Sequence, residues 1–121
     1  MYKPFLVAAV LSCFATPALA DCKNPVTQLD MNQCAASDLA RADAKLNANY
    51  KKLMTLLDAN QKAEVKGVQL AWIKFKDLNC KFESSSAEGG SMQPLLRDSC
   101  LIDLTEARNK DILSWIESFG M

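Results

Sequence analysis

Cysteine is the residue type with the greatest chemical potential in this 121-residue chain, which contains no histidine. Beyond the first 20 residues there are four cysteines, at Cys22, Cys34, Cys80 and Cys100. A catalytic thiol normally needs a base beside it, and zinc sites use closely spaced ligands, so neither role fits these wide spacings. An even set of cysteines in a short exported chain is typical of disulfides. We therefore expect two disulfides, with no metal site, no cofactor and no enzyme activity.

The first 20 residues predict a secretion signal peptide. Lys3 precedes an apolar run over residues 5–11, and Ala18-Leu19-Ala20 has the small-x-small pattern of a cleavage site. The apolar run is too short to cross about 30 Å of hydrocarbon, and no later segment is apolar enough. We expect cleavage after Ala20, which leaves residues 21–121 as a mature domain that is periplasmic or secreted.

A lipid anchor on the mature N-terminus is the alternative to a free protein. Such an anchor needs a cysteine directly after a small residue at the cleavage point. Cys22 follows Asp21, which is a poor residue in that place, and the apolar region before Cys13 is very short. A free mature protein therefore fits better, and it loses Cys13 together with the signal.

Charge and size exclude several classes of protein. Loss of the signal removes Lys3, so the formal charge changes from 14 − 14 = 0 to 13 − 14 = −1. Without a basic run, nucleic acid is an improbable partner. About 100 residues form one modest core, which disulfides reinforce. We expect one domain and a protein partner, and the sequence does not predict the oligomeric state.

Three long amphipathic helices and no strands are predicted for the mature chain. The first begins after Thr27, whose hydroxyl and the Asp30 carboxylate form a capping pair, and it runs to about Asp58. Its apolar positions recur at three- and four-residue steps: Met31, Cys34, Ala35, Leu39, Ala42, Leu46, Tyr50, Leu53 and Leu57.

The second and third helices follow the same pattern. The second apolar stripe consists of Val65, Val68, Trp72, Phe75, Asn79 and Phe82. After a polar, glycine-bearing loop, the third helix runs from Pro94 to about Ser118, with an inward stripe of Leu101, Leu104, Arg108, Ile112, Trp115 and Phe119. Short connections favour antiparallel neighbours, so the expected fold is an all-α, three-helix up-down-up bundle.

This arrangement favours one pairing of the cysteines. Cys80 lies near the end of the second helix and Cys100 near the start of the third. A hairpin of these two helices therefore places both cysteines at a similar height along the helix axes. Cys22 lies in the lead-in and can fold back on Cys34. We favour Cys22–Cys34 with Cys80–Cys100, although four cysteines permit two other pairings. All four then gather at one end of the bundle.

Several spaced motifs occur in order along the mature chain: Asp21-Cys22, residues 27–35, Gln69, residues 71–75, Asp77 with Cys80, residues 88–91 and Cys100, together with single positions. They resemble the LprI-like lysozyme inhibitors, many of which are known only as a domain of unknown function. Among the matching positions, those expected to have structural roles are Met31, Asn32, Leu46, Asn47, Tyr50, Trp72, Phe75 and Arg108. Lys76 departs from the pattern, because the family usually has arginine before Asp77, and lysine cannot make a bidentate contact.

The resemblance implies a cell-envelope protein that binds and inhibits lysozyme-type muramidases. A periplasmic interaction module without effect on lysozyme, such as an adaptor, a chaperone-like protein or an immunity protein, is the alternative. A lysozyme-type active site is a cleft with two carboxylates, which a loop carrying hydrogen-bond donors can block. The candidate partner-binding residues are Lys81, Ser84, Ser85, Ser86, Glu88, Gly89, Gly90 and Ser91, together with Lys76 and Asp77. A plain solvated connection is the competing interpretation of this loop.

Five of these residues have both a structural and a functional interpretation. Trp72 and Phe75 are expected to pack in the core rather than to form a recognition surface. Lys76 and Asp77 are expected to form an ion pair at the surface or within the bundle. Arg108 lies on an apolar stripe, where a lone charge is costly, so it should meet a carboxylate such as that of Asp43 or Asp77.

Overall fold

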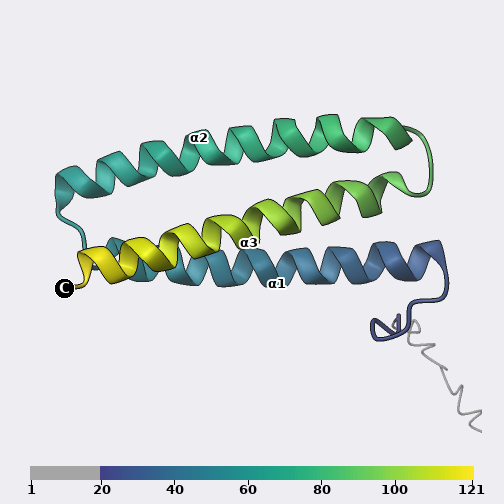
Figure 1. Ribbon diagram of the computed structural model, residues 1–121, viewed down its shortest axis with the longest axis horizontal. Helices are drawn as coiled ribbons and strands as arrows, with labels where there is room; N and C mark the ends of the chain where they lie inside the picture. Colours follow the sequence, from purple (N-terminus) through teal and green to yellow (C-terminus); the bar gives the residue numbers. More distant parts are fainter. Residues whose placement is uncertain (1–19) are drawn as a thin grey trace, which may run out of the picture.

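The computed structural model describes residues 20–121, and these form three long helices that run up, down and up (Figure 1). The helices are α1 (Gln28–Met54), α2 (Ala59–Ser84) and α3 (Gln93–Phe119), and a short 3-10 turn, η1 (Ser85–Ala87), follows α2. Residues 20–121 contain no strand, so the predicted all-α bundle is confirmed. The predicted signal peptide lies, except for Ala20, outside the described residues.

The first two helices begin with capping boxes. In α1 the Thr27 hydroxyl accepts a hydrogen bond from the Asp30 N–H at 3.0 Å, and the Asp30 carboxylate accepts one from the Thr27 N–H at 3.3 Å. Asp58 and Gln61 make the same exchange at the start of α2. Asp58 therefore has the extended backbone of a cap, and α1 ends at Met54 rather than near Asp58 as predicted.

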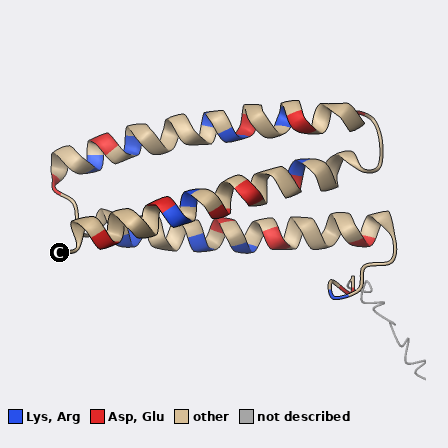
Figure 2. Ribbon diagram, viewed as in Figure 1, with Lys and Arg blue, Asp and Glu red and all other residues tan. Residues whose placement is uncertain are grey.

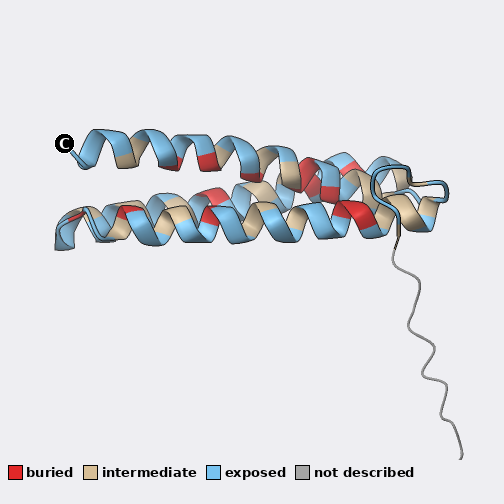
Figure 3. Cartoon of the chain, turned by 90° about the horizontal axis from the view of Figure 1, so that it is seen from below, coloured by how far each residue is buried: buried red, intermediate tan, exposed pale blue. Residues whose placement is uncertain are grey.

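Helix α3 contacts both of the other helices, whereas α1 and α2 make hardly any contact with each other. The main core cluster consists of Leu46, Leu53, Leu57, Trp72 and Ile112. Buried residues lie where the helices meet, and much of each helix remains exposed (Figure 3). The bundle therefore depends on α3 to hold α1 and α2 together.

The predicted pairing of the cysteines is confirmed. Cys22 is joined to Cys34 with a Cα–Cα distance of 5.4 Å, and Cys80 is joined to Cys100 with a distance of 5.5 Å. Both disulfides lie at the end of the bundle where α1 begins and where α2 turns into α3 (Figure 1). The second disulfide therefore links α2 covalently to α3, the helix on which α2 packs.

The predicted core of α2 is only partly correct. Trp72 is buried as expected, but Phe75 is 56% exposed and Phe82 is 79% exposed. The reason is geometric, because α2 packs on α3 along one line and no other helix covers its flank. Phe75 and Phe82 therefore lie beside the contact line, on the uncovered surface of α2.

Arg108 meets a carboxylate as predicted, but that of Asp111, one helical turn further along α3, at 3.8 Å, and not that of Asp43 or Asp77. Its guanidinium carbon also lies 5.2 Å from the centroid of the Trp72 ring and 5.5 Å from that of Trp115. Two cation–π contacts thus add to a long ion pair within the helix.

None of the described helices combines the length and the apolar character that crossing a membrane requires.

Truncation of a buried side chain on α3 should lower the stability of the bundle more than truncation of an exposed one. Ile112 is fully buried and Leu113, the next residue, is 45% exposed. We expect Ile112→Ala to lower the free energy of unfolding by about 2–4 kcal/mol, because it removes packed methylene groups and leaves a cavity. Leu113→Ala should cost about 1 kcal/mol or less, since water already reaches that side chain. Urea titration followed by circular dichroism measures both, and equal losses would contradict the central role of α3.

Candidate functional site

The candidate site is the end of the bundle that carries both disulfides, and we call it the disulfide end. It comprises the lead-in from residue 20 to the start of α1, the last turn of α2 and the connection from Ser85 to Met92. Asn32 on α1 donates a hydrogen bond from Nδ2 to the carbonyl of Ser91 at 3.0 Å. This bond links the first turns of α1 to the connection, so the segments form one surface.

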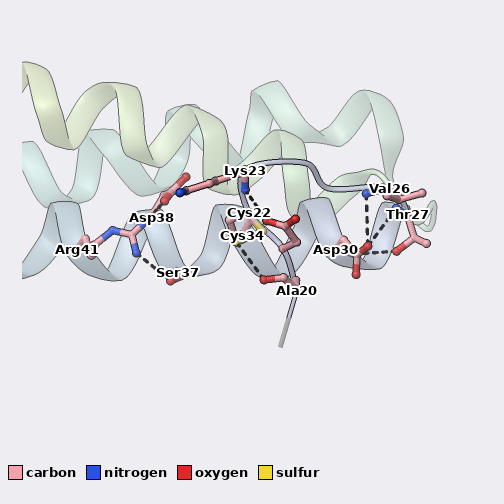
Figure 4. Close-up of a disulfide and its surroundings, with 11 residues drawn as sticks. Ala20, Cys22, Lys23, Val26, Thr27, Asp30, Cys34, Ser37, Asp38 and Arg41 are labelled. Carbon is pink, nitrogen blue, oxygen red and sulfur yellow. Dashed lines mark hydrogen bonds and ion pairs between the residues drawn. A yellow bond between two sulfur atoms is a disulfide. The ribbon is translucent and has the colours of Figure 1, made fainter. Parts of the chain in front are cut away.

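The lead-in is held against α1 by the first disulfide and by local hydrogen bonds (Figure 4). The Lys23 N–H donates to the Asp21 carboxylate at 3.1 Å, and the Val26 N–H donates to the Asp30 carboxylate at 3.4 Å. Further along α1, Arg41 pairs with Asp38. The lead-in is therefore a fixed edge of the disulfide end.

The serine hydroxyls of the predicted loop mostly complete the end of α2. Ser84 is buried, and its hydroxyl donates to the Lys81 carbonyl at 3.3 Å. The hydroxyls of Ser85 and Ser86 donate to the carbonyls of Phe82 and Glu83 at 2.6 and 3.4 Å. Since the last carbonyls of a helix have no partners within it, these serines act as caps. Ser84 is thus inaccessible to a partner, and Ser85 and Ser86 offer oxygen lone pairs rather than free protons.

The backbone of the connection is similarly occupied. The Gly89 N–H donates to Oε1 of Gln93 at 3.3 Å, and the Gly90 N–H donates to the Ala87 carbonyl at 2.9 Å. Gly89 has a φ of 77°, a left-handed conformation that glycine adopts without strain. The amides expected to meet a ligand therefore hold the turn in shape, while the side chains of Lys81, Glu88 and Ser91 remain exposed.

Exposed apolar side chains also gather at the disulfide end, and the sequence analysis did not single them out as functional. These are Val26 and Leu29 at the start of α1, Phe82 on α2 and Met92 before α3. Neither Val26 nor Leu29 belongs to the apolar stripe of the first helix. Their position outside this stripe was the sign in the sequence that both side chains are exposed. Exposed apolar residues among polar neighbours are typical of protein contact surfaces.

Lys76 and Asp77 do not form the predicted ion pair. Among residues 20–121, neither takes part in a salt bridge, and Nζ of Lys76 lies 4.8 Å from the centroid of the Trp72 ring. A lysine makes this cation–π contact without the planar fork of an arginine. Lys76 thus packs against Trp72 at the edge of the core, and Asp77 is exposed.

Cys80, Cys100 and Glu83 come close enough together to resemble a metal site. Their potential ligand atoms lie within 4.8 Å of one another, and Oε2 of Glu83 lies 2.6 Å from Sγ of Cys100. The two sulfur atoms are bonded to each other, however, and it is the thiolate that binds metals. The cluster is therefore better described as a disulfide with a neighbouring carboxylate, which Asn79 also contacts at 3.2 Å.

Charges of both signs alternate along all three helices (Figure 2). This distribution gives no large surface of one sign for a polyanion such as nucleic acid. The disulfide end is consequently a mixed surface of exposed apolar groups, one exposed lysine in the last turn of α2 and a rigid polar turn.

Comparisons with known proteins agree with the motifs in the sequence. Residues 20–112 match a family model described as "Lysozyme inhibitor LprI". An uncharacterized protein of Rhizobium meliloti (strain 1021) is 34% identical, over 91% of this chain and 92% of its own length. No solved structure matches.

The bond between Asn32 and Ser91 gives a test of how the disulfide end is held together. Asn32→Ala removes that bond and the one that Asn32 Oδ1 accepts from Gln28. We expect a loss of about 1 kcal/mol of stability and faster amide hydrogen exchange in residues 85–92, because the tether of the connection is lost. Gln33→Ala, at the exposed neighbouring position, is the control. Unchanged exchange in Asn32→Ala would show that the disulfides alone fix the connection.

Proposed function

This chain belongs to the LprI family of lysozyme inhibitors, and we propose that it is an exported protein that binds a lysozyme-type muramidase and blocks its activity. The family match carries the proposal, because it spans most of residues 21–121 and includes both disulfides. Two disulfides also fit an oxidising compartment such as the periplasm or the cell exterior. The proposed action is binding, so the chain supplies shape and charge rather than reacting groups.

We place the contact with the enzyme at the disulfide end. Two covalent links and the Asn32 bond fix this surface before binding, so little conformational entropy is lost in the complex. Its exposed apolar residues, Val26, Leu29 and Met92, provide area that can be buried against a partner. Residues of this kind at a rigid end are suited to covering the mouth of a cleft.

Lys81 provides the charge that this mechanism needs. It is exposed in the last turn of α2, next to the connection. Glycoside hydrolases of the lysozyme type work with two carboxyl groups in a cleft, and an ammonium group brought to that cleft is attracted to them. Because the hydroxyls of Ser84, Ser85 and Ser86 and the amides of Gly89 and Gly90 already have partners, we assign the electrostatic part of recognition to Lys81 instead.

Inhibition can be measured as the slowing of bacterial cell-wall lysis when mature, oxidised protein is titrated into muramidases of several types. We expect Lys81→Glu to raise the inhibition constant at least about tenfold, because the introduced carboxylate repels those of the cleft. Lys51→Glu is a matched control, since Lys51 is also an exposed lysine in the last turn of a helix but lies at the opposite end of the bundle.

The two variants place the same charge change at two helix C-termini, so their effects on stability should be similar. Equal inhibition by both would move the contact away from the disulfide end. Lysis that continues unchanged at excess wild-type protein, for every muramidase tried, would refute the proposed function itself and favour an interaction module with another partner.

A further inference from the structure

Helix α2 carries a second apolar line that no part of residues 20–121 covers. It consists of Val68, Ala71, Phe75, Leu78 and Phe82, all of them exposed, and we call it the α2 seam. The line that packs on α3 runs beside it, through Val65 and Trp72. Phe75, Leu78 and Phe82 are more than half exposed and lie away from the core, whereas Val68 borders a groove that Val65 and Trp115 also line.

The spacing of the seam is that of a helix–helix contact. Its residues follow one another at steps of three, four, three and four, which is the a/d pattern of a coiled coil. At 1.5 Å per residue the seam is about 21 Å long. Such a narrow, straight apolar stripe fits a second helix better than it fits a small molecule.

We propose that the α2 seam pairs with the seam of a second copy of this chain, with the two α2 helices antiparallel about a two-fold axis at Phe75. In this register Phe75 meets Phe75 of the second copy, Ala71 meets Leu78, and Val68 meets Phe82. The contact is isologous, so every pairing occurs twice except the one on the axis.

The sizes of the side chains favour this direction. The small residues, Val68 and Ala71, lie in the first half of the seam, and the large ones, Leu78 and Phe82, lie in the second half. Antiparallel pairing sets each small residue against a large one, which keeps the helices evenly spaced and the contact filled. Parallel pairing would set Phe82 against Phe82 and Ala71 against Ala71, leaving a gap at one end.

The charges along the seam favour the same direction. Glu64 continues the seam at the start of α2, whereas Lys81 flanks its last turn. Antiparallel pairing brings Glu64 toward the lysine-bearing end of the second copy, and parallel pairing would bring like charges together. Lys74 is the exception, because it lies close to the axis and approaches its own equivalent.

The available area matches a weak, specific contact. The four larger side chains of the seam are between 47% and 79% exposed, which leaves about 480 Å² on each copy if a fully exposed large side chain has roughly 200 Å². Two copies would therefore bury at most about 950 Å² of seam surface, and their flanking residues bring the total to about 1,200 Å², the lower end of specific interfaces. We expect a dissociation constant in the micromolar range.

Sedimentation equilibrium of the mature, oxidised protein between about 1 and 200 µM tests the pairing. The wild type should pass from monomer to dimer over this range. Leu78→Glu should weaken the dimer at least about tenfold, because it places a carboxylate in the apolar contact. Leu70→Glu is the control: Leu70 and Leu78 are both 58% exposed on α2, but Leu70 lies on another face of the helix and should leave the dimer unchanged.

A double variant tests the direction of the helices. In Ala71→Glu/Leu78→Lys, antiparallel pairing brings the introduced carboxylate at position 71 to the introduced ammonium at position 78 of the second copy. The double variant should then associate more strongly than Leu78→Lys alone. In a parallel pair the same change sets like charges together, so weaker association of the double variant would overturn the antiparallel register.

Other outcomes refute the self-association itself. A wild-type protein that stays monomeric throughout the concentration range overturns it, as does equal dissociation by Leu78→Glu and Leu70→Glu. If the protein is monomeric and Leu78→Glu alone abolishes muramidase inhibition, the seam is a docking surface for the enzyme. Circular dichroism and non-reduced mass mapping of each variant show whether the fold and both disulfides persist, and the sedimentation results do not depend on the proposed inhibition.

Discussion

The one-sided attachment of α2 to α3 is the constraint on which the rest of this molecule depends. All three helices contribute to one core cluster, but α3 makes most of the contacts and α1 and α2 hardly touch each other. Trp72 is the main side chain that α2 contributes to the core, with Arg108 from α3 and Lys76 against its ring. The Cys80–Cys100 disulfide secures the same contact covalently, at the end where the helices turn. Attachment along one line leaves the remaining apolar surface of α2 without a partner.

The same constraint explains why the disulfide end is rigid. The turn between α2 and α3 has its serine hydroxyls on helix carbonyls and its glycine amides on nearby acceptors, so it has little freedom to adapt. Its surface is consequently preformed, with recognition left to the side chains that project from it. A small domain gains stability and a fixed surface from the same covalent links.

Much of this structure follows from the sequence because its determinants are local. The capping boxes at Thr27 and Asp58, the proline in the first turn of α3 and the pairing of the cysteines are set by residues close together or by the hairpin that joins them. The exposed position of Phe75 could not be predicted in this way. Residues 65, 72 and 79 and residues 68, 75 and 82 form two lines with the same seven-residue period, on neighbouring faces of one helix. Periodicity identifies both lines as apolar, but only the packing of α3 decides which one is buried.

The two surfaces of the molecule meet in the last turn of α2, where Lys81 and Phe82 belong to both, and are otherwise separate. The α2 seam ends at Phe82, just before the connection, so antiparallel pairing about Phe75 sets each disulfide end beside the α1–α2 turn of the second copy. The two disulfide ends then lie at opposite ends of the pair and point away from each other. A dimer of this kind offers two separate sites, and two targets fixed near each other could engage one site each, so that weak single contacts add up to strong retention. The apolar surface that α3 leaves uncovered on α2 would then have a use, since it doubles the number of binding ends without enlarging the domain.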